Sequence, residues 1–332
     1  MKILAFESSC DETSVAIVED GRRVFANVVR SQAENHRQYG GVVPEVASRQ
    51  HLILANEALQ AAIDESQLDL QDIDVFAATL GPGLVGSLLV GAQAAKTLAF
   101  ITGKPFRGVN HLHGHIASNY LESTLEPPFL CLLVSGGHCQ LMDVQAYDTM
   151  PLLGQTLDDA VGETYDKVAR VLGLGYPGGP VLDQLAQTGD ATRYALPVGK
   201  TQGRFDFSFS GLKTATARLA QNELKADDQT ALADLAASFQ HAAVQALVQR
   251  TQAAQQALGY TTVAVAGGVA ANSALRQQLA DWCTEQGLQL HLPHMAFCTD
   301  NAAMIASAAF FSPLTEAMAD EVFSRQKTVP CR

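Results

Sequence analysis

The sequence predicts an α/β protein built from two similar lobes. Its 332 residues exceed most single hydrophobic cores and fit two lobes of ordinary size. Short apolar runs that indicate strands alternate with longer helical patterns along the chain. A strand, a small polar loop and a second strand occur at 6–15 and again at 134–141, and further αβ units follow each occurrence. This weak structural repeat predicts two α/β halves with a cleft between them.

Hydrophobic content, net charge and cysteine pattern limit the classes of function that the chain can have. The chain is 47% hydrophobic and 17% charged, which predicts a large core and argues against disorder. Its formal net charge of −12 makes it a poor nucleic-acid binder on its own, because Lys and Arg bind phosphates. A nucleic-acid substrate would require local basic patches or a basic partner. Six scattered cysteines without a CxxC pair predict reduced thiols in a cytosolic protein.

The first half is expected to begin with an antiparallel meander, in which the polar loop 8–14 joins the first two strands. A glycine loop at 81–87 lacks the Lys of a Walker A motif, so close helix–strand packing is favoured over phosphate binding. The nearly all-apolar pattern at 84–100 predicts a helix buried between layers. Polar residues or glycines interrupt the long apolar runs, and the N-terminus lacks a signal-peptide region, so no membrane segment is expected. The expected strands are 2–7, 15–18, 24–29, 73–80 and 104–109, and the expected helices are 44–62 and 84–100.

The second half repeats the strand–loop–strand pattern and adds more helices. A helix expected at 156–172 would carry Asp159, Glu163 and Asp166 on one face, for which a solvated acidic face is the favoured interpretation. A Pro/Gly loop then begins another helix, with Asp183 in its first turn. The other expected strands are 129–134, 139–144, 262–266 and 288–292, and the other expected helices are 232–257 and 302–309.

The stretch 200–213 interleaves basic and aromatic residues. Such a segment could contact RNA through stacking and charge. A packed inserted loop is the favoured alternative.

Two histidines follow the expected strand 104–109. His111 and His115 lie four residues apart, beside a helical pattern expected at 116–121, and on a helix they would share one face. Two imidazoles at this spacing can bind one cation. The alternative is that they are polar ends of a core helix, and a metal site would need a third ligand.

Other polar residues fall where strands end. Three tips rich in small residues, 8–14, 135–138 and 267–272, could present backbone N–H groups to a nucleotide. Asn272 could pair with a purine or ribose edge. Asp300 is either a helix N-cap or a carboxylate at a strand-to-helix junction, where open α/β sheets place their sites. With the histidines it would complete a metal site able to polarise a carbonyl or phosphoryl oxygen.

Seven motifs in register make the chain resemble the universal tRNA N6-adenosine threonylcarbamoyltransferase (TsaD) family, formerly described as a glycoprotease or O-sialoglycoprotein endopeptidase. The resemblance covers essentially the whole chain, and its length resembles bacterial members. The motifs are ESSCDET at 7–13, HLHGH at 111–115, LVSGGH at 133–138, YPGGP at 176–180, FSFSGLKT at 207–214, GGVAAN at 267–272 and CTDNAAM at 298–304.

The resemblance implies an actin-like ATPase fold, the class of sugar kinases and heat-shock ATPases, with two ribonuclease-H-like lobes around a nucleotide cleft. We expect an N-terminal lobe at 1–125 and a C-terminal lobe at 126–332, with a helical insertion at about 150–225. The implied reaction transfers threonylcarbamoyl from threonylcarbamoyl-AMP to N6 of the adenosine 3′ of the anticodon in tRNAs reading ANN codons. The implied partners are tRNA, a smaller paralogous subunit bound through the N-terminal lobe, and an ATPase subunit. We expect the protein to be cytoplasmic and not to bind a membrane.

The resemblance also implies site residues. His111, His115 and Asp300 match the metal ligands of the family, whose members are described with iron, and zinc is chemically plausible for this ligand set. The positions that match substrate contacts are Val134, Ser135, Gly136, Gly137, His138, Asp166, Gly179, Asp183 and Asn272. Glu12 or Asp11 could accept the proton from the attacking amine, and the alternative for both is a hydrogen-bonded, water-filled loop.

Three rival functions would each require different residues. A zinc protease of the HExxH type would need a Glu where this chain has Leu112, which removes the general base. A sugar or acetate-type kinase of the same fold class would not need His111 and His115. A non-catalytic nucleotide-sensing scaffold would retain its cellular role after substitution of His111.

Overall fold

The computed structural model describes residues 1–224, 228–315 and 321–325. The chain divides into two compact units, one formed by Met1–Leu125 and the residues from Asp300 onward, and the other by Glu126–Thr299. The second lobe expected at 126–332 is therefore shorter at its C-terminal end. The physical reason is that helix α10 (Ala302–Phe311) packs on the sheet of the first unit.

The first unit is built on a five-stranded sheet in the order β3-β2-β1-β4-β5. The first three strands pair antiparallel, which confirms the predicted meander, and β1, β4 and β5 pair in parallel. The strands are β1 Lys2–Glu7, β2 Glu12–Glu19, β3 Arg23–Ser31, β4 Val75–Gly81 and β5 Phe106–Asn110.

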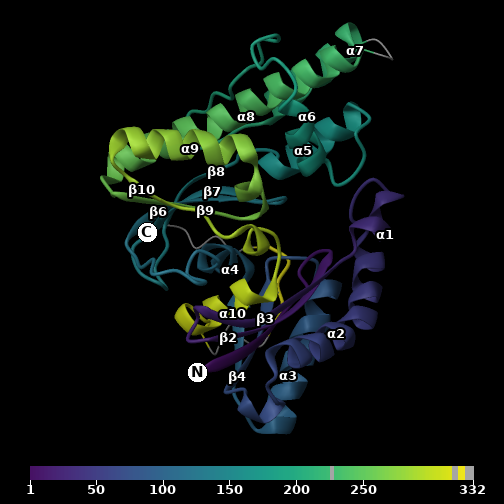
Figure 1. Cartoon of the computed structure of the whole chain (residues 1–332), viewed down its shortest axis with the longest axis vertical. Helices are drawn as coiled ribbons and strands as arrows, with labels where there is room; N and C mark the ends of the chain where they lie inside the picture. Colours follow the sequence, from purple (N-terminus) through teal and green to yellow (C-terminus); the bar gives the residue numbers. More distant parts are fainter. Residues whose placement is uncertain (225–227, 316–320, 326–332) are drawn as a thin grey trace. The chain divides into compact units, whose positions relative to one another are not determined.

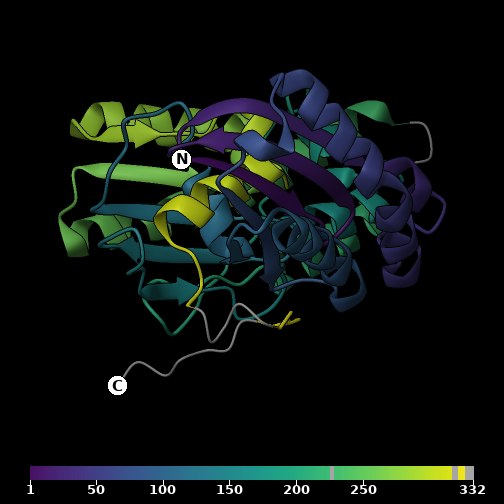
Figure 2. The same cartoon turned by 90° about the horizontal axis from the view of Figure 1, so that it is seen from below.

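Helices pack on both faces of this sheet (Figure 1). Leu4 and Phe6 of β1 share a core with alanines of two long helices, α2 (Pro44–Ser66) and α3 (Val85–Thr102). Ile3 and Ala5 alternate to the opposite face, where α10 contacts β1 and β2. In Figure 2 the yellow α10 lies along the purple strands. The other helices of this unit are α1 Ala33–Arg37 and α4 His111–Ala117, with a 3-10 turn at Leu70–Asp72.

Hydrogen bonds tie α10 to the first sheet. The Ala302 N–H donates to Ser14 Oγ at 2.8 Å, and Ser307 Oγ donates to the Gly21 carbonyl at 2.7 Å. Both partners belong to or adjoin the meander. These contacts fix the junction that carries Asp300 against the first sheet.

The apolar helix α3 is not buried between layers, contrary to the prediction. Its small residues, including Gly91 and Ala95, face the sheet, while Leu89 is 42% and Phe100 86% exposed. Among the described residues it is the one helix long and apolar enough to cross a membrane, and 33% of its residues are buried. Core helices of soluble proteins can have the same length and hydropathy. Apolar composition predicted burial without identifying what covers the outer face.

The second unit repeats the topology of the first, as the strand–loop–strand pattern predicted. Its five-stranded sheet has the order β10-β9-β6-β7-β8, with β6, β7 and β8 antiparallel and β6, β9 and β10 parallel. The strands are β6 Phe129–Val134, β7 Cys139–Val144, β8 Leu152–Gln155, β9 Thr262–Ala266 and β10 Gln289–His291.

Helices of the second unit pack around this sheet and one another, and several differ from the sequence prediction. The helix expected from 156 begins at Val161, because Thr156 joins an extended segment by donating its N–H to the Cys139 carbonyl and bridging to Phe207. The edge strand β8 was not predicted. The helices are α5 Val161–Val171, α6 Gly178–Ala186, α7 Ser210–Glu223, α8 Gln229–Leu258 and α9 Ser273–Gln286, with 3-10 turns at Gly268–Ala271 and Met295–Phe297.

The stretch 200–213 is packed at its aromatic residues. Phe207 and Phe209 are buried, and Phe207 exchanges backbone hydrogen bonds with Gln155 and Leu157. These residues therefore belong to a packed loop, as the favoured alternative predicted.

In the second unit, the tip 267–272 closely approaches the end of strand β6, and this approach requires a glycine at position 267. Its φ is +90°, and a Cβ there would lie 2.4 Å from the Val134 carbonyl oxygen. We predict that Gly267→Ala lowers the free energy of unfolding by about 3 kcal/mol, because backbone strain and a backbone clash add. Gly287→Ala is the control: its φ is +66°, and a Cβ there would have no described atom within 4 Å, so the substitution should cost only about 1–2 kcal/mol. Urea denaturation followed by circular dichroism measures both, and equal losses would contradict the close-approach argument.

Candidate active site

The two histidines lie on the short helix α4 in the first unit. This helix begins at His111, five residues before the expected start at 116, because the Asn110 side chain caps it by accepting the Leu112 N–H at 2.9 Å. Both histidines are buried, and their ring centroids are 4.6 Å apart. The early helix start is what places them one turn apart on a common face.

The carboxylate of Glu7 orients His111. Glu7 ends strand β1 and is buried, and its Oε2 lies 3.1 Å from His111 Nδ1. Glu7 is itself held by the Thr79 hydroxyl at 2.6 Å and by the Ser9 N–H at 2.5 Å. A carboxylate acceptor at Nδ1 leaves Nε2 as the ring nitrogen available for a ligand, as in carboxylate–histidine–metal arrangements. The sequence reasoning assigned no role to Glu7, although a carboxylate ending a buried strand is an available signal.

Asp300 completes the cluster. Its Oδ1 lies 3.3 Å from His115 Nε2 and 3.6 Å from His111 Nε2. One ligand atom from each of the three side chains can be chosen so that all lie within 4.8 Å of one another. The structure thus brings together the three residues expected to bind metal.

The donor set fits one divalent metal ion. His115 is fully buried, and within the described residues neither of its ring nitrogens has a hydrogen-bond partner. Buried polar atoms normally have partners, so a ring nitrogen that faces a carboxylate without a hydrogen bond suits a ligand. Two imidazoles and one carboxylate are typical ligands of iron or zinc.

The two carboxylates make this site favourable for positive charge. Burial by itself lowers the pKa of His111, but Asp300 and Glu7 outweigh burial and raise that pKa to about 9. Burial also opposes ionisation of Glu7, yet the His111 ring lowers the pKa of Glu7 overall.

The polar tip 8–14 joins β1 and β2 beside the histidines, and it carries Asp11 and Glu12. Ser9 Oγ lies 3.2 Å from His111 Nδ1. Burial, then the neighbouring carboxylates of Asp11 and Asp300, raise the pKa of Glu12 well above its usual range. Burial and the same carboxylates raise the pKa of Cys10, which therefore stays a thiol rather than a nucleophilic thiolate. The negative charge of Asp300 therefore acts on the ionisable groups of this tip.

The tip 135–138 of the second unit is a tight turn after β6. The Ser135 N–H donates to the His138 carbonyl at 2.8 Å, and Ser135 Oγ accepts the His138 N–H at 3.2 Å. Val134 and Ser135 are buried, whereas Gly136 and Gly137 are exposed, with open space where a Cβ would lie. The turn therefore presents an accessible backbone at its apex.

Asp166 and Gly179 meet where helices α5 and α6 pack. Asp166 accepts the Gly178 N–H at 2.8 Å, so it lies on the inner side of α5 and not on a purely solvated face. A Cβ at Gly178 would lie 2.4 Å from the Ala169 Cβ, whereas Gly179 has open space. The contact within the protein thus requires Gly178, and Gly179 is the position open to a ligand.

Asp183 and Asn272 belong to one hydrogen-bond network. Asp183 lies in the second turn of α6 and not the first, because that helix begins at Gly178. It accepts from Gln240 at 2.9 Å and from the Ser273 hydroxyl at 2.7 Å. Asn272 caps α9 with its oxygen, and its amide nitrogen donates to Asp183 and to Gln240. Its polar atoms are thus used within the protein, and Asn272 holds Asp183 in place.

Sequence reasoning missed Gln240 and Ser273 of this network. Gln240 is a buried polar residue in the long helix α8. A lone amide within an otherwise apolar helical stripe was the signal that could have identified it.

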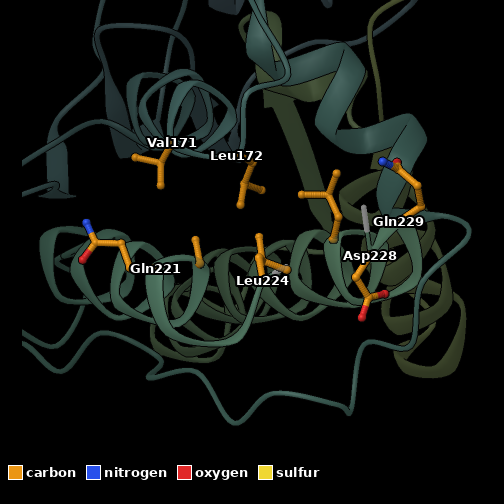
Figure 3. Close-up of a pocket in the computed structure, with 8 residues that line it drawn as sticks. Val171, Leu172, Gln221, Leu224, Asp228 and Gln229 are labelled. Carbon is orange, nitrogen blue, oxygen red and sulfur yellow. The ribbon is translucent and has the colours of Figure 1, made fainter. Parts of the chain in front are cut away.

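A separate hollow of about 490 Å³ in the second unit contains none of the predicted site residues (Figure 3). Its lining is mainly apolar side chains of α5, α7 and α8. The lining residues are Val171, Leu172, Ala220, Gln221, Leu224, Asp228, Gln229 and Leu232.

The residue that caps α10 bears on the two roles expected for Asp300, which are a helix N-cap and a carboxylate at a strand-to-helix junction. Asn301, not Asp300, caps this helix by accepting the Met304 N–H at 3.0 Å. We predict that Asn301→Ala lowers the free energy of unfolding by about 1 kcal/mol, as loss of an N-cap does. Asp300→Ala should cost less, because Asn301 keeps the cap and because repulsion from the Glu7 and Glu12 carboxylates offsets the attraction of Asp300 to the His111 ring. Thermal denaturation of the metal-free variants compares them, and a larger loss for Asp300→Ala would restore the capping interpretation.

Comparisons of sequence agree with the motif resemblance. The family profile described as tRNA N6-adenosine threonylcarbamoyltransferase (TsaD) matches residues 23–307. A relative with that name from Nostoc punctiforme is 54% identical over 314 residues, which cover 92% of this chain and 90% of the relative. One from Clostridium botulinum strain Hall is 49% identical over 313 residues, covering 94% and 92%.

Comparisons of structure show the fold. HypF from T. kodakarensis superposes with a TM-score of 0.62 at 17% identity over 93% of this chain, which spans only 47% of HypF. The activator of 2-hydroxyisocaproyl-CoA dehydratase from Clostridium difficile has a TM-score of 0.52 at 13% identity, covering 93% and 94%. Both likenesses place the chain in the actin-like ATPase fold class that the motifs implied. Together, the profile and the relatives identify the chain as a member of the tRNA N6-adenosine threonylcarbamoyltransferase (TsaD) family.

Proposed function

We propose that this chain transfers the threonylcarbamoyl group from threonylcarbamoyl-AMP to N6 of the adenosine 3′ of the anticodon in tRNAs reading ANN codons, releasing AMP. Membership of the family supports the transferase activity. The observation in this chain that carries the proposal is the cluster of the buried His111 and His115 with the half-buried Asp300. A kinase of the same fold class would have no use for it.

The reaction needs a base for one proton. The adenosine N6 attacks the carbamoyl carbon, a C–N bond forms, and the bond from that carbon to the AMP phosphate oxygen breaks with its electron pair. The N6 proton goes to a base of the chain, for which we propose Glu12 or Asp11. Support for Glu12 is its raised pKa, which makes its ionised form a stronger base than an ordinary carboxylate. The amine is a poor nucleophile, so positioning must supply much of the acceleration.

One divalent metal, Fe²⁺ or Zn²⁺, would be held by His111, His115 and Asp300, and it would supply Lewis-acid polarisation of the carbamoyl carbonyl. Glu7 keeps His111 in the tautomer and orientation that this role requires. The Thr79 and Ser9 contacts to Glu7 keep that carboxylate in place.

We assign the adenylate to residues of the second unit. The exposed backbone at Gly136 and Gly137 and the open space over Gly179 suit close approach by a nucleotide. Val134, Ser135 and His138 shape the turn, and Asp166 and Asp183 offer carboxylates to ribose hydroxyls. Asn272 acts by holding Asp183.

Partners are part of the proposal because the chain has a net charge of −12. A tRNA needs basic surface, which we assign in part to a smaller paralogous subunit and an ATPase subunit. An apolar groove of about 590 Å³ between α2 and α3 supports the first of these partners. Leu52 and Leu89 on its rim are 69% and 42% exposed, and apolar patches of this kind mark interaction surfaces.

The metal assignment has a matched control on the same helix. We predict that His111→Ala and Asp300→Ala lose bound iron or zinc and reduce transfer by about 10²-fold or more, because both remove a ligand. His113→Ala changes a histidine outside the cluster and should retain metal and activity. Metal content by plasma mass spectrometry and modified adenosine by nucleoside mass spectrometry measure these outcomes. Full transfer by metal-free His111→Ala would refute the metal role.

The transfer assay uses preformed threonylcarbamoyl-AMP, unmodified tRNA and the partner proteins. Modified adenosine in the wild-type reaction is the expected product. If no modification forms but ATP-dependent phosphate appears on a small acceptor, the kinase alternative replaces the proposal.

The apolar groove between α2 and α3 can be tested as the docking surface with substitutions that each add one positive charge. We predict that Leu52→Arg or Leu89→Arg weakens binding of the paralogous subunit by about 10²-fold, because each places a charge in an apolar contact. Gln60→Arg adds the same charge on α2 outside the groove and should bind like the wild type. Isothermal titration calorimetry measures the affinities. Equal weakening by all three would exclude the groove as the docking surface.

A further inference from the structure

His51 connects helix α2 to the polar tip that carries Asp11 and Glu12. It is a fully buried residue of α2, a position for which neither the sequence motifs nor the proposed chemistry provides a role. Its ring reaches two residues of the tip, Cys10 and Thr13. Cys10 immediately precedes and Thr13 immediately follows Asp11 and Glu12, the two carboxylates proposed as the base.

The hydrogen bonds fix one tautomer of His51. Nε2 lies 3.0 Å from the Cys10 carbonyl oxygen, which can only accept, so Nε2 carries the proton. Nδ1 must then accept, and it lies 2.7 Å from Thr13 Oγ1 and 3.3 Å from Gln32 Nε2, both of which can donate. Burial lowers the pKa of His51, in agreement with a neutral ring. Every polar atom of the ring is therefore used to hold backbone or side chain at the tip.

Gln32 makes further hydrogen bonds that join the tip to helix α2. The Gln32 N–H donates to the Asp11 carbonyl at 3.0 Å, and the Gln32 amide also lies 3.4 Å from the Ala47 carbonyl of α2. Without the ring, the Cys10 carbonyl and the Thr13 hydroxyl would both lose a buried partner, which is costly.

The same helix also forms one wall of the apolar groove. Leu52, next to His51, lines the groove, and so does Phe6, the neighbour of Glu7 in β1. One turn of α2 thus presents an apolar side chain outward and a hydrogen-bonding ring inward. A shift of this helix would move the ring that holds the tip.

We infer that His51 is a positioning residue: it clamps Cys10 and Thr13 so that Asp11 and Glu12 stay in place for proton transfer, and it ties this geometry to the helix that lines the docking groove. The catalytic part of this inference rests on the proposed function. The structural part, the clamp itself, does not.

The test uses the full chain with its partners and three substitutions at one position. His51→Gln places an amide N–H near the position of Nε2 and keeps the donor to Cys10. His51→Asn places its amide near Nδ1 and loses that donor. His51→Leu loses both hydrogen bonds. Thr13→Val, which removes only the donor to Nδ1, is a milder variant that keeps the ring.

Hydrogen–deuterium exchange of a peptide covering residues 8–15 measures the clamp independently of activity. His51→Leu and His51→Asn should increase exchange there by about tenfold, because a local opening becomes easier when buried hydrogen bonds are lost. His51→Gln should stay near the wild type. Metal content at His111, His115 and Asp300 should be unchanged in all of them. Wild-type exchange in His51→Leu, or equal exchange in His51→Gln and His51→Leu, would overturn the clamp.

Steady-state transfer then tests the catalytic part. We expect His51→Leu to lower kcat by about 10- to 100-fold with little change in the KM for threonylcarbamoyl-AMP, since misplacing a base affects the chemical step. His51→Gln should restore most of kcat. A change in KM alone would overturn the positioning role. If the wild type itself transfers nothing, the proposed function fails, and the exchange experiment alone decides whether His51 clamps the tip.

Discussion

The candidate metal site depends on the return of the chain to the first sheet after the second unit is complete. Asp300 follows 174 residues of the second unit, Glu126–Thr299, and still lies 3.3 Å from His115 Nε2. Packing of α10 on the strands, with Ala302 hydrogen-bonded to Ser14, supplies the energy that fixes this junction. Burial of an alanine-rich helix against a sheet is non-directional, but the hydrogen bonds at its start define the register. The third ligand is therefore positioned by core packing and not by a flexible loop.

The repeated sheet topology explains why polar residues collect at strand ends. In each unit, two antiparallel strands leave a short tip beside the ends of parallel strands, and small residues allow the tips to pack closely. The first unit uses this arrangement for histidines and carboxylates, and the second uses it for an exposed glycine backbone. One topology thus supplies two different chemistries, because the side chains at the tips differ.

Much of the fold was predictable from pattern. The antiparallel starts of both sheets, and strands such as Phe129–Val134, follow directly from apolar runs bounded by turn signals. The pair of histidines was predictable from spacing, and the choice at Asp300 between capping α10 and facing the histidines was not. That choice depended on whether Asn301 or its neighbour capped α10, which is a detail of geometry that a sequence leaves open.

Long-range partners explain what the sequence could not predict. Glu7 and Gln240 acquire their importance from residues about a hundred or several tens of positions away, so no local pattern marks them. The outer face of α3 was predicted to be buried because apolar composition alone does not identify what covers a helix. The start of α5 was predicted too early because the extended pairing of Thr156 with Phe207 overrode a helical pattern.

The measurement that tests this account most directly is a crystal structure of the protein purified with its native metal, with anomalous diffraction recorded on both sides of the iron and zinc absorption edges. The account predicts one anomalous peak, about 2.0–2.2 Å from Nε2 of His111, Nε2 of His115 and a carboxylate oxygen of Asp300. A metal ligated elsewhere, or an ordered metal that leaves Asp300 unligated, would contradict the claim that the returning chain completes this site.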